Sequence, residues 1–251
     1  MTEAVAPRTF IYEEEHEMPV VDVSHLVTED DTPVDNILSE RQMDLLIDSI
    51  YASWSGPGEG VPFVALANVA FYFALHQQPL VPDALISVDV QLPQDIWRKE
   101  NRSYLIWEYG KPPDVVVEIV SNRKGQEKGR KLAQYARVGI PYYVVFDPYL
   151  LLGEQHLTVY ALRDGHYQES GQTWLPGVGL GVTLWSGSYR GMQTTWLRWQ
   201  DAQGKVLLTG QEQADQAKKQ AALAESQAGI ERDRAERLAA QLRAAGIDPE
   251  L

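Results

Sequence analysis

The stretch that decides the fold reads PPDVVVEIVSN and covers residues 112–122. Five β-branched residues in it flank a single carboxylate, Glu118. An almost unbroken β-branched run predicts a central strand that is buried on both faces. A lone carboxylate in such a strand costs several kcal/mol unless a cation or hydrogen bonds compensate it. Glu118 is therefore the first candidate site residue, and an ion pair with an arginine is the structural alternative.

The sequence after this strand predicts a helix and a second strand. Ser121-Asn122 can cap the helix, and Gly139 can end it. Residues Tyr142–Phe146 then form another apolar run before an Asp-Pro pair. A strand–helix–strand unit of this length implies a right-handed crossover and parallel strands.

The helix of this unit is basic, although the chain is acidic. The chain has 22 basic and 35 acidic residues and a net charge of −13, which argues against nucleic-acid binding over the whole surface. Within residues 123–137 the only acidic residue is Glu127. The basic residues of that segment are Arg123, Lys124, Lys128, Arg130, Lys131 and Arg137. This local inversion of sign favours a phosphate-binding face.

Asp83 is the natural second carboxylate. Pro82-Asp83 precedes residues 84–92, which we predict to form a strand, although a Pro-Asp pair alone is common in turns. On adjacent strands, Asp83 and Glu118 can together hold one Mg²⁺, with Mn²⁺ as a substitute, because hard cations prefer oxygen ligands. Such an ion lowers the pKa of bound water and offsets charge on a phosphate.

Lys131 is the third candidate. Lys124, Lys128, Lys131 and Tyr135 recur at spacings of four, three and four, which places them on one helix face. A lysine there can orient the attacking water or neutralise the scissile phosphate. The alternative for any one of these lysines is a solvated basic face.

The rest of the chain divides into three predicted regions: an acidic N-terminal arm (1–33), a core with a β extension (34–208) and a long helical tail (209–251). The expected elements are a strand at Thr9–Tyr12, a helix at Asp35–Tyr51, a buried strand and turn or a short helix at Phe63–Leu75, a hairpin of Leu157–Leu162 and His166–Glu169, a second hairpin of Thr195–Trp199 and Lys205–Leu208, and a helix over 211–245. The large apolar residues of the tail helix are Leu223, Ile230, Leu238 and Leu242. Their thin seam predicts a weak coiled coil, which allows a homodimer, or a solvated helix.

Several classes of protein are disfavoured. No run of 18 apolar residues occurs, and the N-terminus lacks a secretory signal, so we expect a cytoplasmic protein with no membrane span. Cysteine is absent, which excludes disulfides and thiolate chemistry. The five histidines lack metal-ligand spacing, and no glycine-rich phosphate loop occurs. Two carboxylates are also typical of glycosidases, but the basic helix beside them fits phosphate better.

These residues resemble a known family. The motifs that carry the resemblance are Pro82-Asp83, residues 113–121, Lys131, Tyr135 and residues 139–148. Together they are similar to the Uma2 family of endonucleases in the PD-(D/E)XK superfamily, over about residues 35–208 and with a similar appended helix. The resemblance implies an α/β restriction-endonuclease-like fold: a mixed β-sheet with flanking helices, extended by β-hairpins and a long C-terminal helix.

The resemblance also implies roles for individual residues. Asp83 takes the place of the aspartate in the superfamily motif, and Glu118 takes that of the acidic member of (D/E)XK. The lysine expected two places later is absent, because position 120 is valine, and Lys131 on the following helix takes its place. A second departure is Asn68, where many members carry aspartate.

The leading hypothesis is a Mg²⁺-dependent endonuclease acting on DNA. Asp83 and Glu118 would bind the metal, and Lys131 would assist the water or the phosphate. The residues expected to contact the DNA backbone are Lys124, Lys128 and Arg130. One rival is a catalytically silent nuclease fold used as a binding module, which Asn68 and the acidic charge favour. Another is a scaffold that assembles through its tail.

Overall fold

The computed structural model describes residues 22–23, 36–122 and 127–246. The predicted strand at Thr9–Tyr12 and residue Lys124 lie outside these ranges. The helices are α1 (Ile37–Ser53), α2 (Ile106–Tyr109), α3 (Leu132–Val138) and α4 (Gly210–Ala244), with a 3₁₀ turn η1 (Lys99–Asn101) and a π-helical turn η2 (Glu127–Lys131). None of the helices in these ranges combines the length and apolar character needed to cross a membrane.

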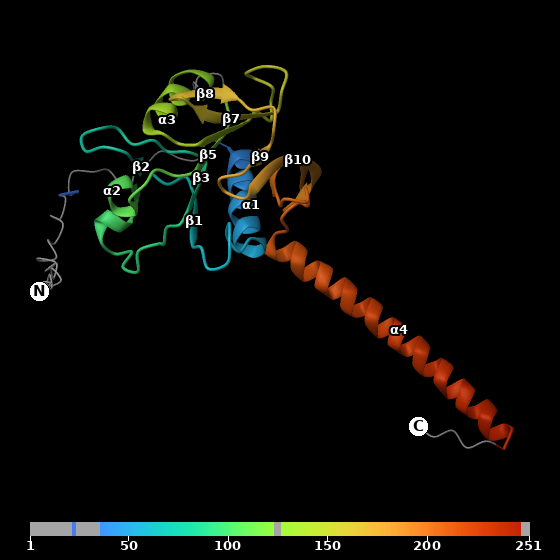
Figure 1. The fold of residues 1–251 in the computed structure, drawn as a ribbon. Coiled ribbons are helices and arrows are strands. Elements are labelled where there is room, and N and C mark those ends of the chain that lie inside the picture. Colours follow the sequence, from blue (N-terminus) through green and yellow to red (C-terminus); the bar gives the residue numbers. More distant parts are fainter. Residues whose placement is uncertain (1–21, 24–35, 123–126, 247–251) are drawn as a thin grey trace, which may run out of the picture.

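A six-stranded sheet forms the centre of the molecule, in the order β1-β3-β5-β6-β7-β8 (Figure 1). Its strands are β1 (Phe63–Ala67), β3 (Ala84–Val88), β5 (Val115–Ile119), β6 (Tyr142–Phe146), β7 (Leu157–Arg163) and β8 (His166–Glu169). β5 and β6 pair in parallel, and every other neighbouring pair in this sheet is antiparallel. The predicted parallel unit and the predicted β7–β8 hairpin are therefore confirmed.

Two smaller sheets accompany it. One is a parallel pair of β2 (Phe71–Tyr72) and β4 (Tyr104–Leu105), and the other is an antiparallel sheet of β9 (Trp174–Leu175), β10 (Leu180–Tyr189) and β11 (Met192–Gln200). The ambiguous run Phe63–Leu75 thus forms two strands, β1 and β2, with a break between them.

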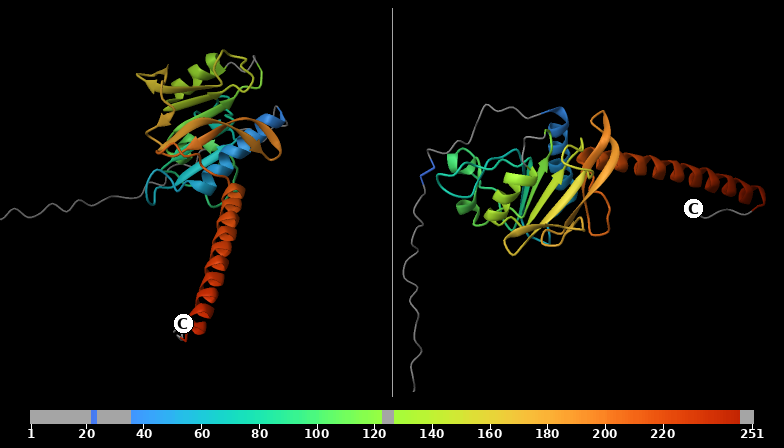
Figure 2. Two further views of the ribbon diagram at one scale, coloured as in Figure 1. Left: turned by 90° about the vertical axis from the view of Figure 1, so that its right-hand side faces the viewer. Right: turned by 90° about the horizontal axis from the view of Figure 1, so that it is seen from above.

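Each face of the central sheet has its own core. On one face α1 and the β9–β11 sheet pack over residues such as Ile86, Val117 and Val144. On the other face α3, β2 and β4 pack over residues such as Leu85 and Val116. The architecture confirms the predicted mixed-sheet, restriction-endonuclease-like fold (Figure 2).

Two predicted boundaries are wrong. The predicted strand over residues 84–92 ends at Val88, because Asp89 has a φ of 59°, which interrupts extended backbone. The second predicted hairpin is also misplaced. β11 pairs along its length with β10, and the segment after it contributes only an isolated bridge between Gln200 and Val206. The turn of the real hairpin is Arg190-Gly191, where both residues have positive φ, of 43° and 81°.

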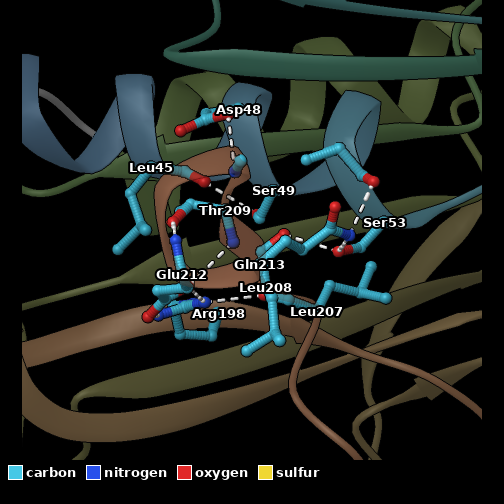
Figure 3. Close-up of polar contacts among 12 residues, drawn as sticks. Leu45, Asp48, Ser49, Ser53, Arg198, Leu207, Leu208, Thr209, Glu212 and Gln213 are labelled. Carbon is cyan, nitrogen blue, oxygen red and sulfur yellow. Dashed lines mark hydrogen bonds and ion pairs between the residues drawn. The ribbon is translucent and has the colours of Figure 1, made fainter. Parts of the chain in front are cut away.

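The predicted tail helix is confirmed to within one residue at each end, as α4. Figures 1 and 2 show it leaving the rest of the fold after its first turns. Its base is attached by polar contacts that Figure 3 shows. Thr209 and Glu212 form a capping box, and Glu212 also pairs with the buried Arg198 at 2.7 Å. Gln213 donates to the carbonyl oxygen of Ala52 at the end of α1.

Candidate active site

The register of the central sheet brings Asn68, Asp83 and Glu118 into one row. Ala67 pairs with Ala84 across β1 and β3, and Ala84 pairs with Val117 across β3 and β5. One step further along the same register, Asn68, Asp83 and Glu118 lie opposite one another. The Asn68 backbone N–H donates to the Asp83 carbonyl at 3.1 Å, which shows that the pairing continues to this step.

The Asp83 carboxylate reaches toward β5. Its Oδ2 accepts a hydrogen bond from the backbone N–H of Ile119 at 2.6 Å. Ile119 directly follows Glu118, so this bond joins the start of β3 to the end of β5. The two carboxylates are close enough that the charge of Asp83 raises the pKa of Glu118.

Glu118 is buried, with 2% of its side chain exposed, and both of its oxygens have donors. Lys131 Nζ donates to Oε2 at 2.7 Å, and the Tyr135 hydroxyl donates to Oε1 at 2.6 Å. Burial is the largest effect on the pKa of Glu118 and raises it to about 8, against the lowering effect of Lys131 and Tyr135. A group with this pKa changes its protonation near neutral pH.

The basic segment after β5 supplies both donors. Lys131 is the last residue of η2, and Tyr135 follows one turn later in α3, so both point toward the same face of the sheet. Gly139, with a φ of 89°, ends α3 as predicted. The sequence assigns no role to Tyr135, although its spacing of four residues from Lys131 was an available signal.

Of the three predicted phosphate contacts, the structure describes the side chain of Arg130, which is exposed. Lys128 lies in η2. Lys124 lies outside the described residues. Val120 is fully buried in the hydrophobic core, so the side chain two places after Glu118 has no access to solvent.

The donor set fits a hard divalent cation with two protein carboxylates. Within the described ranges, no group of three or more histidines and carboxylates is placed to hold a metal ion. Mg²⁺ is commonly bound through one or two carboxylates while it keeps several waters, so Asp83 and Glu118 are the residues that would hold such an ion. The Lys131 ammonium group already contacts Glu118 Oε2, so a bound cation has to compete with it for that oxygen.

The comparison with protein families agrees with this reading of the fold. A family model, Uma2, described as "Putative restriction endonuclease", matches residues 31–181. The chain belongs to the Uma2 family. The match spans the row of Asn68, Asp83 and Glu118 as well as Lys131 and Tyr135, and it ends before α4. A comparison with curated proteins gave no match.

Proposed function

We propose that this Uma2 protein is a divalent-metal-dependent endonuclease that hydrolyses phosphodiester bonds in DNA. The observation that carries the proposal is the buried Glu118 carboxylate beside Asp83, paired with Lys131 at 2.7 Å. Membership of a family described as restriction endonucleases supports the same reaction class. In superfamily terms, Asp83 and Glu118 take the two acidic positions of the PD-(D/E)XK motif.

Each residue has a distinct part in this proposal. Asp83 and Glu118 would hold Mg²⁺ or Mn²⁺. Such an ion, when bound, supplies counter-charge for the phosphate and lowers the pKa of water. Tyr135 and Lys131 hold the two Glu118 oxygens, which fixes the direction of the carboxylate. Lys131 is about one-third exposed, at 32%, so its ammonium group can also reach a phosphate or a water at the site.

The DNA backbone would lie along the basic segment that follows β5. Lys124, Lys128 and Arg130 are the proposed phosphate contacts. When a few such residues neutralise phosphates, counterions are released from the DNA, which favours binding at this segment. The net charge of −13 opposes DNA binding elsewhere on the surface. The site would therefore bind DNA weakly in the absence of metal and with a strong dependence on salt.

A second candidate function is a catalytically silent nuclease fold that binds without cleaving. Asn68 favours it, because an amide stands in the row where a third carboxylate would add to the affinity for a cation. The two candidates differ in metal binding. In a silent module, titration with Mn²⁺ should give no heat of binding that is lost when Asp83 or Glu118 is substituted.

The test is cleavage of supercoiled plasmid with Mg²⁺ or Mn²⁺, together with calorimetric titration of Mn²⁺. Asp83→Asn and Glu118→Gln keep the side-chain shapes and remove the charges. We expect each to lower cleavage about 100-fold or more, as loss of a key electrostatic group usually does. Glu154→Gln, in an exposed loop, is the matched control and should cleave like the wild type. Equal cleavage by Glu118→Gln would overturn the assignment.

A further inference from the structure

The long helix α4 is exposed along most of its length. Its 35 residues extend for about 52 Å at 1.5 Å per residue. Leu223, Ile230 and Leu238 expose 65%, 61% and 49% of their surfaces. A helix that stands alone in water needs many side-chain pairs to support it. Among the described residues of α4, the only ion pair between two residues of the helix joins Arg234 and Glu231 at 4.0 Å. This helix therefore lacks the side-chain pairing expected of an isolated one.

A heptad repeat of small residues runs along α4. Starting at Ala214, the spacing alternates between three and four residues, as in a coiled coil. The residues of this seam are Ala214, Ala217, Ala221, Ala224, Ala228, Glu231, Ala235, Leu238, Leu242 and Ala245. All but Glu231 are apolar, and the seam is exposed from Ala214 to Leu238. Two of the four large apolar residues of this helix, Leu223 and Ile230, lie outside the repeat, so the repeat is not apparent from the large residues alone.

We propose that α4 pairs with α4 of a second copy of this chain, in antiparallel orientation and with full overlap. In this register Ala217 faces Leu242 of the second copy, and Ala221 faces its Leu238. Ala224 faces Ala235. Small residues thus face the two leucines near each end of the seam, and Ala228 faces Glu231 at its centre.

The charges beside the seam select this register. Lys218, Glu225 and Arg232 occupy equivalent flanking positions, seven residues apart. With full antiparallel overlap, Glu225 of each copy faces Arg232 of the other, which gives two attractive pairs. A shift by one heptad in one direction sets Glu225 against Glu225 and Lys218 against Arg232. A shift in the other direction sets Arg232 against Arg232.

The parallel alternative is disfavoured by Glu231. In a parallel pair in register, this residue would face its own copy within the seam. In the antiparallel pair it faces Ala228, and Arg234 on its own helix is near enough to offset its charge. The base of α4 is attached to the body through Glu212 and Arg198, so the pairing would hold two folded bodies at opposite ends of a rod.

Charge reversal in the full-length chain tests the pairing. The variants are Glu225→Arg, Arg232→Glu and the double variant, and sedimentation equilibrium gives the dimer dissociation constant. Each single variant converts two attractive pairs into two repulsive ones, so we expect about tenfold weaker dimerisation or more. The double variant should return to within about threefold of the wild type. Asp233→Arg, on the face away from the seam, is the control and should change the constant less than about twofold.

Disulfide trapping tests the orientation, because the chain contains no cysteine of its own. Ala224→Cys and Ala235→Cys should cross-link when the two single variants are mixed. Neither should cross-link alone, since two copies of residue 224 would lie about 16 Å apart along the antiparallel pair, beyond the reach of a disulfide. Self-cross-linking of Ala224→Cys would show a parallel dimer and overturn the orientation. A wild-type chain that stays monomeric at about 100 μM would overturn the pairing itself. Neither result depends on nuclease activity.

Discussion

The Asp83 carboxylate accepts a hydrogen bond from the backbone N–H of Ile119, at 2.6 Å, and so is fixed to β5 beside Glu118. Because the donor is a backbone group, this attachment does not depend on the Glu118 side chain. A substitution of Glu118 therefore leaves this hydrogen bond in place, although the charges of the two carboxylates remain coupled.

The first prediction concerns the charge of Asp83. Asp83→Asn keeps an oxygen that can accept from Ile119 but removes the negative charge. We expect the fold to be retained and Mn²⁺ affinity to fall about tenfold or more, which isothermal titration calorimetry measures. Asp83→Ala also loses the hydrogen bond and should lower the free energy of unfolding by about 1 kcal/mol as well. Unchanged metal affinity in Asp83→Asn would remove Asp83 from the site.

Metal binding should depend on pH through Glu118. The pKa of this carboxyl is raised to about 8, chiefly by burial, so the metal-free protein holds a proton there over much of the neutral range. A cation binds the ionised form and must displace that proton. We therefore expect Mn²⁺ affinity to rise with pH and to level off above about pH 8. The affinity of Glu118→Gln should be low, with little change over the same range. An affinity that falls as pH rises would contradict this linkage.

The strand that carries Glu118 and the helix α4 were predictable because their signals are local. A β-branched run identifies β5, and a long segment free of proline identifies α4. The β10–β11 hairpin was missed because Arg190-Gly191 lacks the usual Asn-Gly or Asp-Gly turn signature. Asp201–Gly204 resembled a hairpin turn more closely, although it joins no pair of full strands.

The site itself was predictable only in part. Asp83 and Glu118 could be selected as carboxylates next to strands, and Lys131 by the face of its helix. The Asp83–Ile119 hydrogen bond could not be found from the sequence, because it requires the register of two strands separated by a long connection. The role of Tyr135 required the packing of α3 on the sheet, which local periodicity does not specify.

Tyr135 should be a positioning residue for Glu118. Tyr135→Phe removes the donor to Oε1 and leaves a buried carboxylate with one fewer hydrogen bond, so we expect about 1–3 kcal/mol lower stability in urea unfolding. Mn²⁺ affinity should change as well, because the carboxylate is less well fixed. Tyr167→Phe is the matched control: its hydroxyl donates to the Ile140 carbonyl within the same aromatic cluster. This control should leave Mn²⁺ affinity unchanged; an equal effect in both variants would reduce Tyr135 to a packing role.

The attachment of α4 should contribute to stability through Arg198. This guanidinium is buried, at 1% exposed, and it bonds to Glu212 and to the Leu207 carbonyl. Glu212→Gln leaves it without its counter-charge. Removing one partner of a fully buried ion pair costs about 3–5 kcal/mol of stability. Because Glu212 is one-third exposed, we expect Glu212→Gln to lower the free energy of unfolding by about 2 kcal/mol, measured by urea unfolding. Asp215→Asn, on the exposed side of the same helix, should have little effect.

The same ion pair gives a pH dependence with a definite sign. Burial alone would raise the pKa of Glu212, but hydrogen bonds from Arg198 and Thr209 outweigh it and lower the pKa below its usual 4.5. A carboxyl with a lowered pKa stabilises the fold above 4.5, and this contribution is lost as pH falls through the folded-state value. The stability difference between wild type and Glu212→Gln should therefore narrow below about pH 4. If this stability difference stays constant with pH, the ionisation of Glu212 does not contribute to it.

Asn68 provides the test that separates an active nuclease from a silent one. It lies directly opposite Asp83 at the exposed end of β1, with a φ of 52° that aspartate tolerates as well as asparagine does. Asn68→Asp should therefore fold normally and add a third carboxylate to the row. We expect Mn²⁺ affinity to rise about tenfold, because each added carboxylate strengthens an oxygen-ligand site. If the amide is what silences the chain, plasmid cleavage should also appear or increase.

The control for Asn68→Asp is Gln78→Glu, which adds the same charge in an exposed loop away from the row. Since charge at a distance is screened in about 0.15 M salt, this control should leave metal affinity unchanged. A gain in affinity without cleavage would mean that the row binds a cation but lacks another catalytic requirement, which favours the silent module. No gain in affinity would place Asn68 outside the ligand set, because its position opposite Asp83 would then have no effect on the ion.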